Sequence, residues 1–228
     1  SLGFGLHLGW SIEGAIGSEF KIDASYLSPN VNVATRLEAS TAQFGVWALI
    51  SHTIINLCSK DMRHYCRLID HVTIKGLRHP LRLYTCDLDY SKLEVQWKGP
   101  ERVTANRFKL RQLRELRKSE KWADDSYMVS RAFETEKDLQ TMRAKYSDQF
   151  FQRFSMAYRN YEVGEWMAAR DMLYTCHYQP KHNLGKQVFT VEEEWPEDGP
   201  VNTLLSYMRQ TQYSAPRGWP GHHELVER

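Results

Sequence analysis

The sequence predicts a first part of mixed strands and helices, followed by an all-α helical-hairpin tail. Strand and helix patterns interleave up to about residue 90, which is typical of an α/β or α+β fold. A strongly basic run with helical leucine spacing follows at 98–121, and the rest of the chain is largely helical in pattern. The predicted divisions are therefore residues 1–97, a basic connecting helix at 98–123 and the tail at 124–228.

Composition is that of an ordinary soluble globular protein. Of 228 residues, 42% are hydrophobic and 25% are charged, and a net charge of +2 is too small to indicate a nucleic-acid partner. The four cysteines form no CxxC pair, so no metal site is predicted in this chain.

The most apolar stretch, FGVWALISHTIINLC, is too short to span a bilayer. Because the chain starts without Met inside an apolar pattern, we expect a soluble fragment of a longer protein.

Alternation and capping signals place the first elements. The segment GLHLGWSI alternates apolar residues with small or polar ones, which predicts a half-buried strand. Ser28 followed by Pro29 is a helix-start signal, so we expect a helix over about 29–39. The segment VWALIS at 46–51 predicts a short buried strand, and Ser51 can cap a second helix.

Two hairpins of different kinds are predicted further along the chain. The segment HVTIKGLRHPLRLYTCDL indicates two strands joined at residues 76–80. In the tail, one helical face carries Phe151, Phe154, Tyr158 and Tyr161. Gly164 then interrupts the helix, and Trp166 begins another; this spacing is similar to the turn of a tetratricopeptide helical hairpin. A further helix is expected from Pro200.

Three polar residues stand out as candidates for ligand binding. Asn32 and Arg36 are four apart, which places them on one helix face about 6 Å from each other along the axis. They can hold one ligand together, or they can be an ordinary solvated pair. Lys75 before the turn residue Gly76 is ambiguous in the same way. Taken singly, these residues leave the function open.

In combination, the motifs resemble the second half of the class III nucleotide cyclase catalytic domain. The segment GLHLGWSIEGAIGS resembles its glycine-marked strand, NVNVATRLE its Asn-x-x-x-Arg helix, and TIKG with YTCDL its closing Lys-Gly hairpin. They occur in the family's order over roughly residues 3–88. The resemblance implies a ferredoxin-like α+β half-domain. The tail, with DGPVNTLLSYM and APRGW, is similar to the tail that follows this domain in several large cyclases of unicellular eukaryotes.

The resemblance implies a role for each candidate residue. Asn32 matches the Asn that orients the ribose, and Arg36 matches the Arg that stabilises charge developing on the α-phosphate. Lys75 matches the Lys that contacts the terminal phosphates. Ser25 falls at the purine-recognising position, with Asp23 as the alternative if the alignment shifts by two residues. ATP is preferred over GTP as the substrate.

The resemblance also implies groups that this sequence does not supply. The family uses two Mg²⁺ or Mn²⁺ ions, whose Asp ligands lie in its first half. We therefore expect the chain to be inactive alone and to form a homodimer or heterodimer with a second cyclase domain. The expected location is the cytoplasmic face of a membrane or a cilium, within a larger protein.

Two other functions remain open. The chain can be a catalytically inactive cyclase-homology scaffold in a larger ciliary or membrane assembly, since a silenced copy would keep Asn32, Arg36 and Lys75. Alternatively, the tail at 124–228 can be an adaptor for a protein partner. For the basic helix at 98–121, a solvated connecting role is preferred over an RNA or anionic-lipid contact, because no base-stacking aromatic residues are interleaved.

Overall fold

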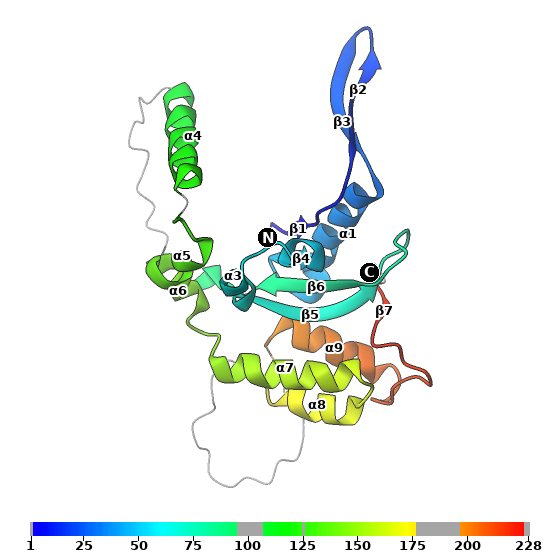
Figure 1. The fold of residues 1–228 in the computed structure, drawn as a ribbon. Helices are drawn as coiled ribbons and strands as arrows, with labels where there is room; N and C mark the ends of the chain where they lie inside the picture. The colour runs from blue at the N-terminus through cyan, green and yellow to red at the C-terminus, as the bar shows by residue number, and fades with distance from the viewer. Residues whose placement is uncertain (1, 95–106, 125, 177–196, 226–228) are drawn as a thin grey trace. The chain divides into compact units, whose positions relative to one another are not determined.

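The computed structural model describes residues 2–94, 107–124, 126–176 and 197–225. They form two compact units, Ser1–Leu88 with Ala144–Arg228, and Asp89–Arg143 (Figure 1). The larger unit mixes strands and helices, in agreement with the predicted α+β class. The boundary predicted near residue 97 lies outside the described residues. Within the described part of the chain, no helix combines the length and the apolar character needed to cross a bilayer.

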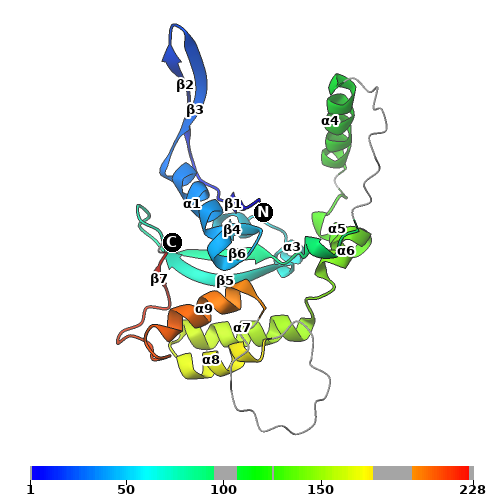
Figure 2. The same ribbon diagram turned by 180° about the vertical axis from the view of Figure 1, so that it is seen from behind.

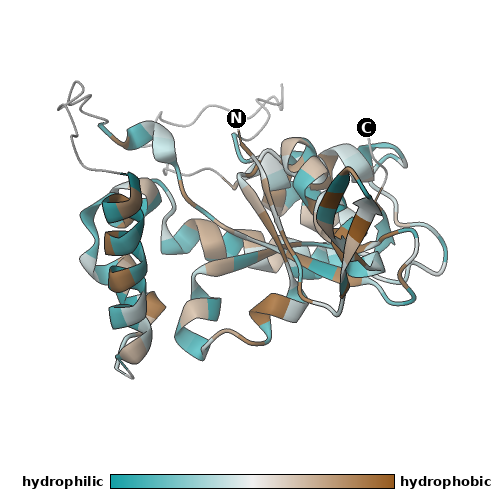
Figure 3. Cartoon of the chain, turned by 90° about the horizontal axis from the view of Figure 1, so that it is seen from above, coloured by the Kyte–Doolittle hydropathy of each residue, from teal (hydrophilic) through white to brown (hydrophobic). Residues whose placement is uncertain are grey.

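A five-stranded mixed sheet organises the larger unit. Its strands, in spatial order, are β1 Phe4–Leu6, β4 Ala48–Ser51, β6 Leu81–Cys86, β5 Cys66–Thr73 and β7 His223–Glu224. β1 is parallel to β4 and β5 is parallel to β7, whereas β6 is antiparallel to both of its neighbours. Figure 3 shows the chain coloured by hydropathy, with hydrophobic residues on both strands and helices. Every residue of β4 is buried.

Helices cover both faces of this sheet (Figures 1 and 2). Those of the larger unit are α1 Pro29–Phe44, α2 His52–Ile55, α3 Lys60–His64, α7 Asp148–Glu162, α8 Trp166–Tyr174 and α9 Gly199–Arg209. α1 lies over one face, and α7, α8 and α9 lie over the other. One hydrophobic core joins the sheet to both helical layers. The smaller unit contains the 3-10 helix η1 Tyr90–Lys92 and the helices α4 Arg107–Ala123, α5 Val129–Thr135 and α6 Lys137–Arg143.

Helix α1 begins where the sequence predicts and ends five residues later. Ser28 caps it, because its Oγ accepts a hydrogen bond from the Asn30 amide at 3.0 Å. Serine is often unfavourable inside a helix, because its hydroxyl competes for the hydrogen-bonding groups of the backbone, and Ser40 lies inside α1. Here the hydroxyl donates to a carbonyl one turn earlier, at 2.8 Å. The helix therefore continues to Phe44 and ends at Gly45, whose φ of 62° is left-handed.

The strand predicted over GLHLGWSI is wrong in its extent and its burial. β1 stops at Leu6, and the side chains of Leu6, Leu8 and Trp10 are 42%, 50% and 64% exposed. The chain leaves the sheet at His7, whose ring turns to Ser51 at 2.9 Å instead of continuing the alternation.

A separate two-stranded sheet follows, made of β2 Ile12–Ser18 and β3 Lys21–Leu27. The two strands are antiparallel, and every residue of β2 is exposed. Phe20 in the turn between them is 97% exposed. This hairpin therefore presents apolar side chains that the described residues do not cover.

Helices α7 and α8 form the helical hairpin that the aromatic pattern predicts. Gly164 joins them with φ of 91°, a conformation that glycine adopts without strain. Three of the four aromatic residues predicted for the inner face are buried, but Phe151 is only partly buried, and Phe150 occupies the core instead. The likeness to a tetratricopeptide unit stays a prediction.

The tail departs from the all-α prediction by adding β7 to the sheet. Val72 and Thr73 pair with His223 and Glu224. The Leu225 amide then donates to the Thr73 carbonyl at 2.9 Å. Because a two-residue strand is too short to show alternation, its pairing partner defines it rather than its own sequence.

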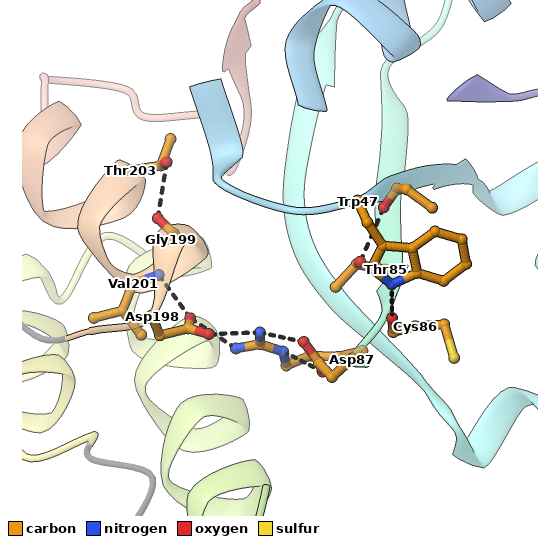
Figure 4. A network of polar contacts seen from close by, with 10 residues as sticks. Trp47, Thr85, Cys86, Asp87, Asp198, Gly199, Val201 and Thr203 are labelled. Atoms are coloured by element: carbon orange, nitrogen blue, oxygen red, sulfur yellow. Dashed lines mark hydrogen bonds and ion pairs between the residues drawn. The ribbon is translucent and has the colours of Figure 1, made fainter. Parts of the chain in front are cut away.

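A buried ion cluster joins the tail to the sheet (Figure 4). Arg67 on β5 donates to both oxygens of Asp87, at 2.9 and 2.7 Å, and to both oxygens of Asp198, at 3.0 and 2.9 Å. Its guanidinium also lies over the rings of Phe150 and Phe154, 5.0 and 4.4 Å from their centroids. Burial alone would lower the pKa of Arg67, but Asp198 and Asp87 raise it above its usual value. Arg67 therefore remains charged inside the protein.

Replacing Asp198 with alanine is expected to lower the free energy of unfolding by about 3 to 5 kcal/mol, because it leaves Arg67 a buried and poorly compensated charge. It also removes the cap of α9, since an Asp198 oxygen accepts from the Val201 amide at 3.0 Å. Chemical denaturation followed by circular dichroism measures the change.

The matched control is Asp171→Ala. The Asp171 carboxylate pairs with Arg170 at 2.6 Å but its side chain is 65% exposed, so a change of at most about 0.5 kcal/mol is expected. Equal effects of Asp198→Ala and Asp171→Ala would contradict a stabilising role for the buried cluster.

A second polar contact holds β7 in place. His223 Nε2 lies 3.0 Å from an Asp70 oxygen, and its Nδ1 lies 3.0 Å from the Glu224 carbonyl oxygen. Both partners are acceptors, so only the doubly protonated imidazolium donates to both. Burial alone would lower the pKa of His223, but the hydrogen bond and charge of Asp70 raise it above its usual value. The ring also stacks on Tyr207, with centroids 4.1 Å apart.

The stability of the larger unit is expected to fall with rising pH because of His223. Its pKa in the folded protein lies above the unfolded value of about 6.5. The extra stability is therefore complete below about pH 6.5 and is lost as the pH rises through the folded pKa. Denaturation midpoints of the wild type and His223→Asn, measured across this range, isolate the contribution. His64→Asn, at an exposed position of α3, is the control, and its denaturation midpoint should depend on pH as in the wild type. If the midpoint of His223→Asn followed pH in parallel with the wild type, His223 would not be the source of the pH dependence.

Candidate functional site

A small hollow lies between α1 and the turn that joins β5 to β6. Its volume is about 90 Å³. It is lined by Pro29, Asn32, Val33, Arg36, Ile74, Lys75, Gly76 and Leu77. The structure therefore brings together Asn32, Arg36 and Lys75, although Lys75 is 39 residues from Arg36 along the chain.

Helix α1 presents Asn32 and Arg36 at this hollow because its neighbouring positions belong to the core. Val33 and Leu37 are buried, whereas Asn32 is exposed and Arg36 is half-buried. The Arg36 Nη1 donates to the Lys75 carbonyl at 3.2 Å. This hydrogen bond ties the helix to the turn and restrains one edge of the guanidinium.

The β5–β6 turn restrains the backbone on both sides of Lys75. Ile74, just before it, is buried, and the Leu77 amide donates to the Ile74 carbonyl at 2.9 Å. Gly76 closes the turn with φ of 99°, a region that L side chains rarely adopt. Lys75 itself is exposed. The exposed lysine therefore sits on a turn whose backbone is well defined.

Sequence reasoning missed a hydrogen-bonded group that positions the start of α1. His7 Nδ1 lies 2.9 Å from Ser51 Oγ, and its Nε2 lies 3.2 Å from Asn30 Oδ1. The Asn30 side-chain Nδ2 also donates to the Trp10 carbonyl at 2.9 Å. These partners are up to 44 residues apart in the chain, so no local pattern could have found them. They fix the first turn of the helix that carries Asn32.

Ser25 and Asp23 do not line the hollow. They lie on β3, where Ser25 pairs with Gly14 across the hairpin. Ser25 is half-buried and Asp23 is exposed. An oxygen of Asp23 is 3.0 Å from the Lys21 ammonium. Their role in recognising a purine stays a prediction.

The lining is suited to an anion. Arg36 and Lys75 supply two cations and Asn32 an amide, and no lining residue is a carboxylate. Mg²⁺ and Mn²⁺ prefer oxygen ligands, carboxylates above all, so these residues do not fit the predicted ions. Among the described residues, no group of three or more His, Cys, Asp or Glu could hold a metal ion.

The hollow is also small. Its volume of about 90 Å³ compares with roughly 300 to 1,000 Å³ for pockets that enclose a small-molecule ligand. It can therefore contact one charged part of a nucleotide-sized ligand, and another surface would have to contact the rest.

Two known proteins are similar to part of this chain. An adenylate cyclase of Anabaena cylindrica is 34% identical over 85 residues, which is 37% of this chain and 17% of that protein. Adenylate cyclase 1 of Rhizobium meliloti strain 1021 is 31% identical over 81 residues, 36% of this chain and 12% of that protein. The chain is therefore similar to these adenylate cyclases over about a third of its length.

The similarity covers a segment rather than a whole protein. The chain spans less than a fifth of the length of either relative, and no family model matches it. The similarity to two adenylate cyclases agrees with the resemblance noted in the sequence.

Replacing Gly76 with alanine is expected to destabilise the turn that carries Lys75. The new Cβ would meet no atom within 4 Å, so the penalty comes from the φ of 99° alone, at about 1 to 2 kcal/mol. The control is Gly14→Ala, whose Cβ also meets open space but whose φ is not left-handed; it should be neutral or slightly stabilising. Thermal denaturation measures the midpoints of the two variants. Equal shifts of the two midpoints from the wild type would argue against backbone strain at position 76 in Gly76→Ala.

Proposed function

We propose that this chain is part of a nucleotide cyclase that converts ATP to cyclic AMP and pyrophosphate. Asn32, Arg36 and Lys75 would be its contribution to a site shared with a second cyclase domain. The observation that carries the proposal is their convergence on one anion-suited hollow. The similarity to two proteins named adenylate cyclase supports the same reaction.

Arg36 would act on the charge that develops during the reaction. The 3′-oxygen of ATP attacks the α-phosphorus, and the bond to the pyrophosphate leaving group breaks, so negative charge builds on the α-phosphate oxygens. A guanidinium meets such oxygens with several coplanar donors and stays charged. The bond from Arg36 to the Lys75 carbonyl restrains the guanidinium before the reaction, which reduces the reorganisation needed in the transition state.

Asn32 and Lys75 would position the substrate around Arg36. An amide both donates and accepts, so Asn32 can hold a ribose hydroxyl or ring oxygen. Lys75 is an exposed ammonium on a defined turn, and as a compact charge it suits the terminal phosphates. Holding the ribose and the phosphates at once would align the 3′-oxygen with the α-phosphorus.

A second cyclase domain, identical or homologous, would complete the site. The small hollow cannot enclose a nucleotide alone. Exposed apolar residues near β1 and on the β2–β3 hairpin offer a surface for that partner; they include Phe4, Leu8, Trp10, Ile12 and Phe20. The ligands for Mg²⁺ or Mn²⁺ would come from outside the residues that line the hollow. Ser25, with Asp23 as the alternative, would contact the purine.

In the full-length parent protein, Arg36→Ala is expected to lower cyclic AMP formation at least about hundredfold. The assay supplies ATP or GTP with Mn²⁺ and separates the cyclic products by chromatography. Arg36→Lys should recover only part of the activity, because an ammonium lacks the planar fork. Arg159→Ala, which removes an exposed arginine of α7, should leave the rate unchanged.

A folded, dimeric parent that forms no cyclic nucleotide would overturn the enzymatic proposal. It would favour the inactive scaffold, with the hollow as an inherited feature. If cyclic GMP were the main product, the proposed cyclase activity would stand, but GTP would replace ATP as the assigned substrate.

A further inference from the structure

Helix α4 of the smaller unit has features that the proposed cyclase reaction does not use. Every residue of this helix, from Arg107 to Ala123, is exposed (green in Figure 1). It contains seven Lys or Arg residues and two Glu residues, a net charge of +5, whereas the whole chain carries only +2. Positive charge is therefore concentrated on one exposed helix.

Five of the cations form a straight stripe along α4. They follow one another at spacings of four, three, four and three residues, which confines them to an arc of about 80° and a length of about 21 Å. The stripe consists of Arg107, Arg111, Arg114, Lys118 and Lys121. Among the described residues, no carboxylate forms an ion pair with any of them. Both glutamates of the helix, Glu115 and Glu120, lie outside the arc.

A row of leucines runs beside the stripe. Leu110, Leu113 and Leu116 are three residues apart and occupy the adjoining 120° or so of the helix surface. They are 37%, 52% and 53% exposed. Lys109, Arg117 and Glu120 lie between them. The long aliphatic stems of Lys109 and Arg117 can lie along an apolar layer while their charged ends reach water. One side of α4 thus combines cations with exposed apolar groups.

We propose that α4 docks on an anionic phospholipid surface, with the stripe on the headgroups and the leucines at the edge of the acyl layer. Adjacent cationic and leucine-bearing arcs are the arrangement by which a helix lies in a membrane interface. The inference is independent of the cyclase reaction. It also revises the preference for a purely solvated helix in this region.

Charge and geometry favour this partner over others. A second copy of α4 would bring its own net charge of +5 and be repelled. Single-stranded RNA would need aromatic residues between the cations for base stacking. The two aromatic residues of α4, Phe108 and Trp122, instead lie near its two ends and outside the arc of the stripe. The Lys118 ammonium is 4.9 Å from the ring centroid of Trp122.

The test uses the full chain and sedimentation with lipid vesicles. One set contains phosphatidylcholine only, and the other contains about 30% phosphatidylserine, an anionic lipid. We expect at least about tenfold stronger partitioning into the anionic vesicles, weakening as salt is raised, because salt screens the headgroup attraction. Equal partitioning into both vesicle types would overturn the proposal.

A charge variant shows whether the stripe is responsible. In Arg111→Gln/Arg114→Gln/Lys118→Gln, each lost cation should weaken binding about fivefold, or roughly hundredfold together. Glutamine is a good helix former, so α4 should persist, and circular dichroism checks this. The control Lys60→Gln/Arg159→Gln/Arg217→Gln removes the same charge from exposed positions elsewhere; a loss as large as that of the stripe variant would refute the assignment to α4.

A leucine variant separates lipid from other polyanions. Leu113→Ser should weaken vesicle binding severalfold while leaving its salt dependence unchanged, because it removes apolar contact but no charge. Unchanged vesicle binding in this variant would reject insertion, and with it the lipid assignment. Tighter binding of a single-stranded RNA than of anionic vesicles, measured by fluorescence anisotropy at the same salt, would also overturn the proposal.

Discussion

Arg67 is enclosed between two carboxylates from distant parts of the chain, Asp87 after β6 and Asp198 before α9. A guanidinium offers its donors in one plane, so both carboxylates must approach within that plane. The two phenylalanine rings of α7 under the guanidinium exclude water from the cluster. Because an incompletely paired buried charge costs several kcal/mol, the tail has one favourable position on the sheet. Apolar packing alone would tolerate small shifts of these helices.

The same strand connects the tail to the candidate site. β5 carries Arg67 and Asp70, which contact the tail, and it leads directly into the turn with Lys75. β7 pairs with the last two residues of β5, immediately before that turn. From the opposite face, Arg36 of α1 bonds to the Lys75 carbonyl. The tail and α1 thus restrain the same turn from two sides, which makes the tail part of the framework of the site.

The surfaces of the larger unit differ in how completely they are covered. The tail buries most of its aromatic residues among its own helices and in the core that it shares with the sheet. Trp166 and Tyr161 are almost fully enclosed and pack on each other, Tyr207 and Trp219. The hairpin of β2 and β3 leaves Phe20, Ile22 and other apolar residues in solvent. Burial of such side chains is favourable wherever a partner can cover them. A small anion-suited hollow in the same unit as this uncovered surface is consistent with a site that is completed by another domain.

The sequence by itself determined the features whose signals lie within a few residues. Ser28 with its following proline marked the start of α1, and the spacing of Asn32 and Arg36 placed both on one helix face. Only the tertiary structure decided that Arg67 pairs with Asp198, because the two are 131 residues apart and a buried ion pair has no periodic signature. It also decided that Phe150 rather than its neighbour enters the core, and that two residues near the end of the chain become a strand. In each of these cases the outcome depends on which surface lies opposite, and that surface exists only after the chain has folded.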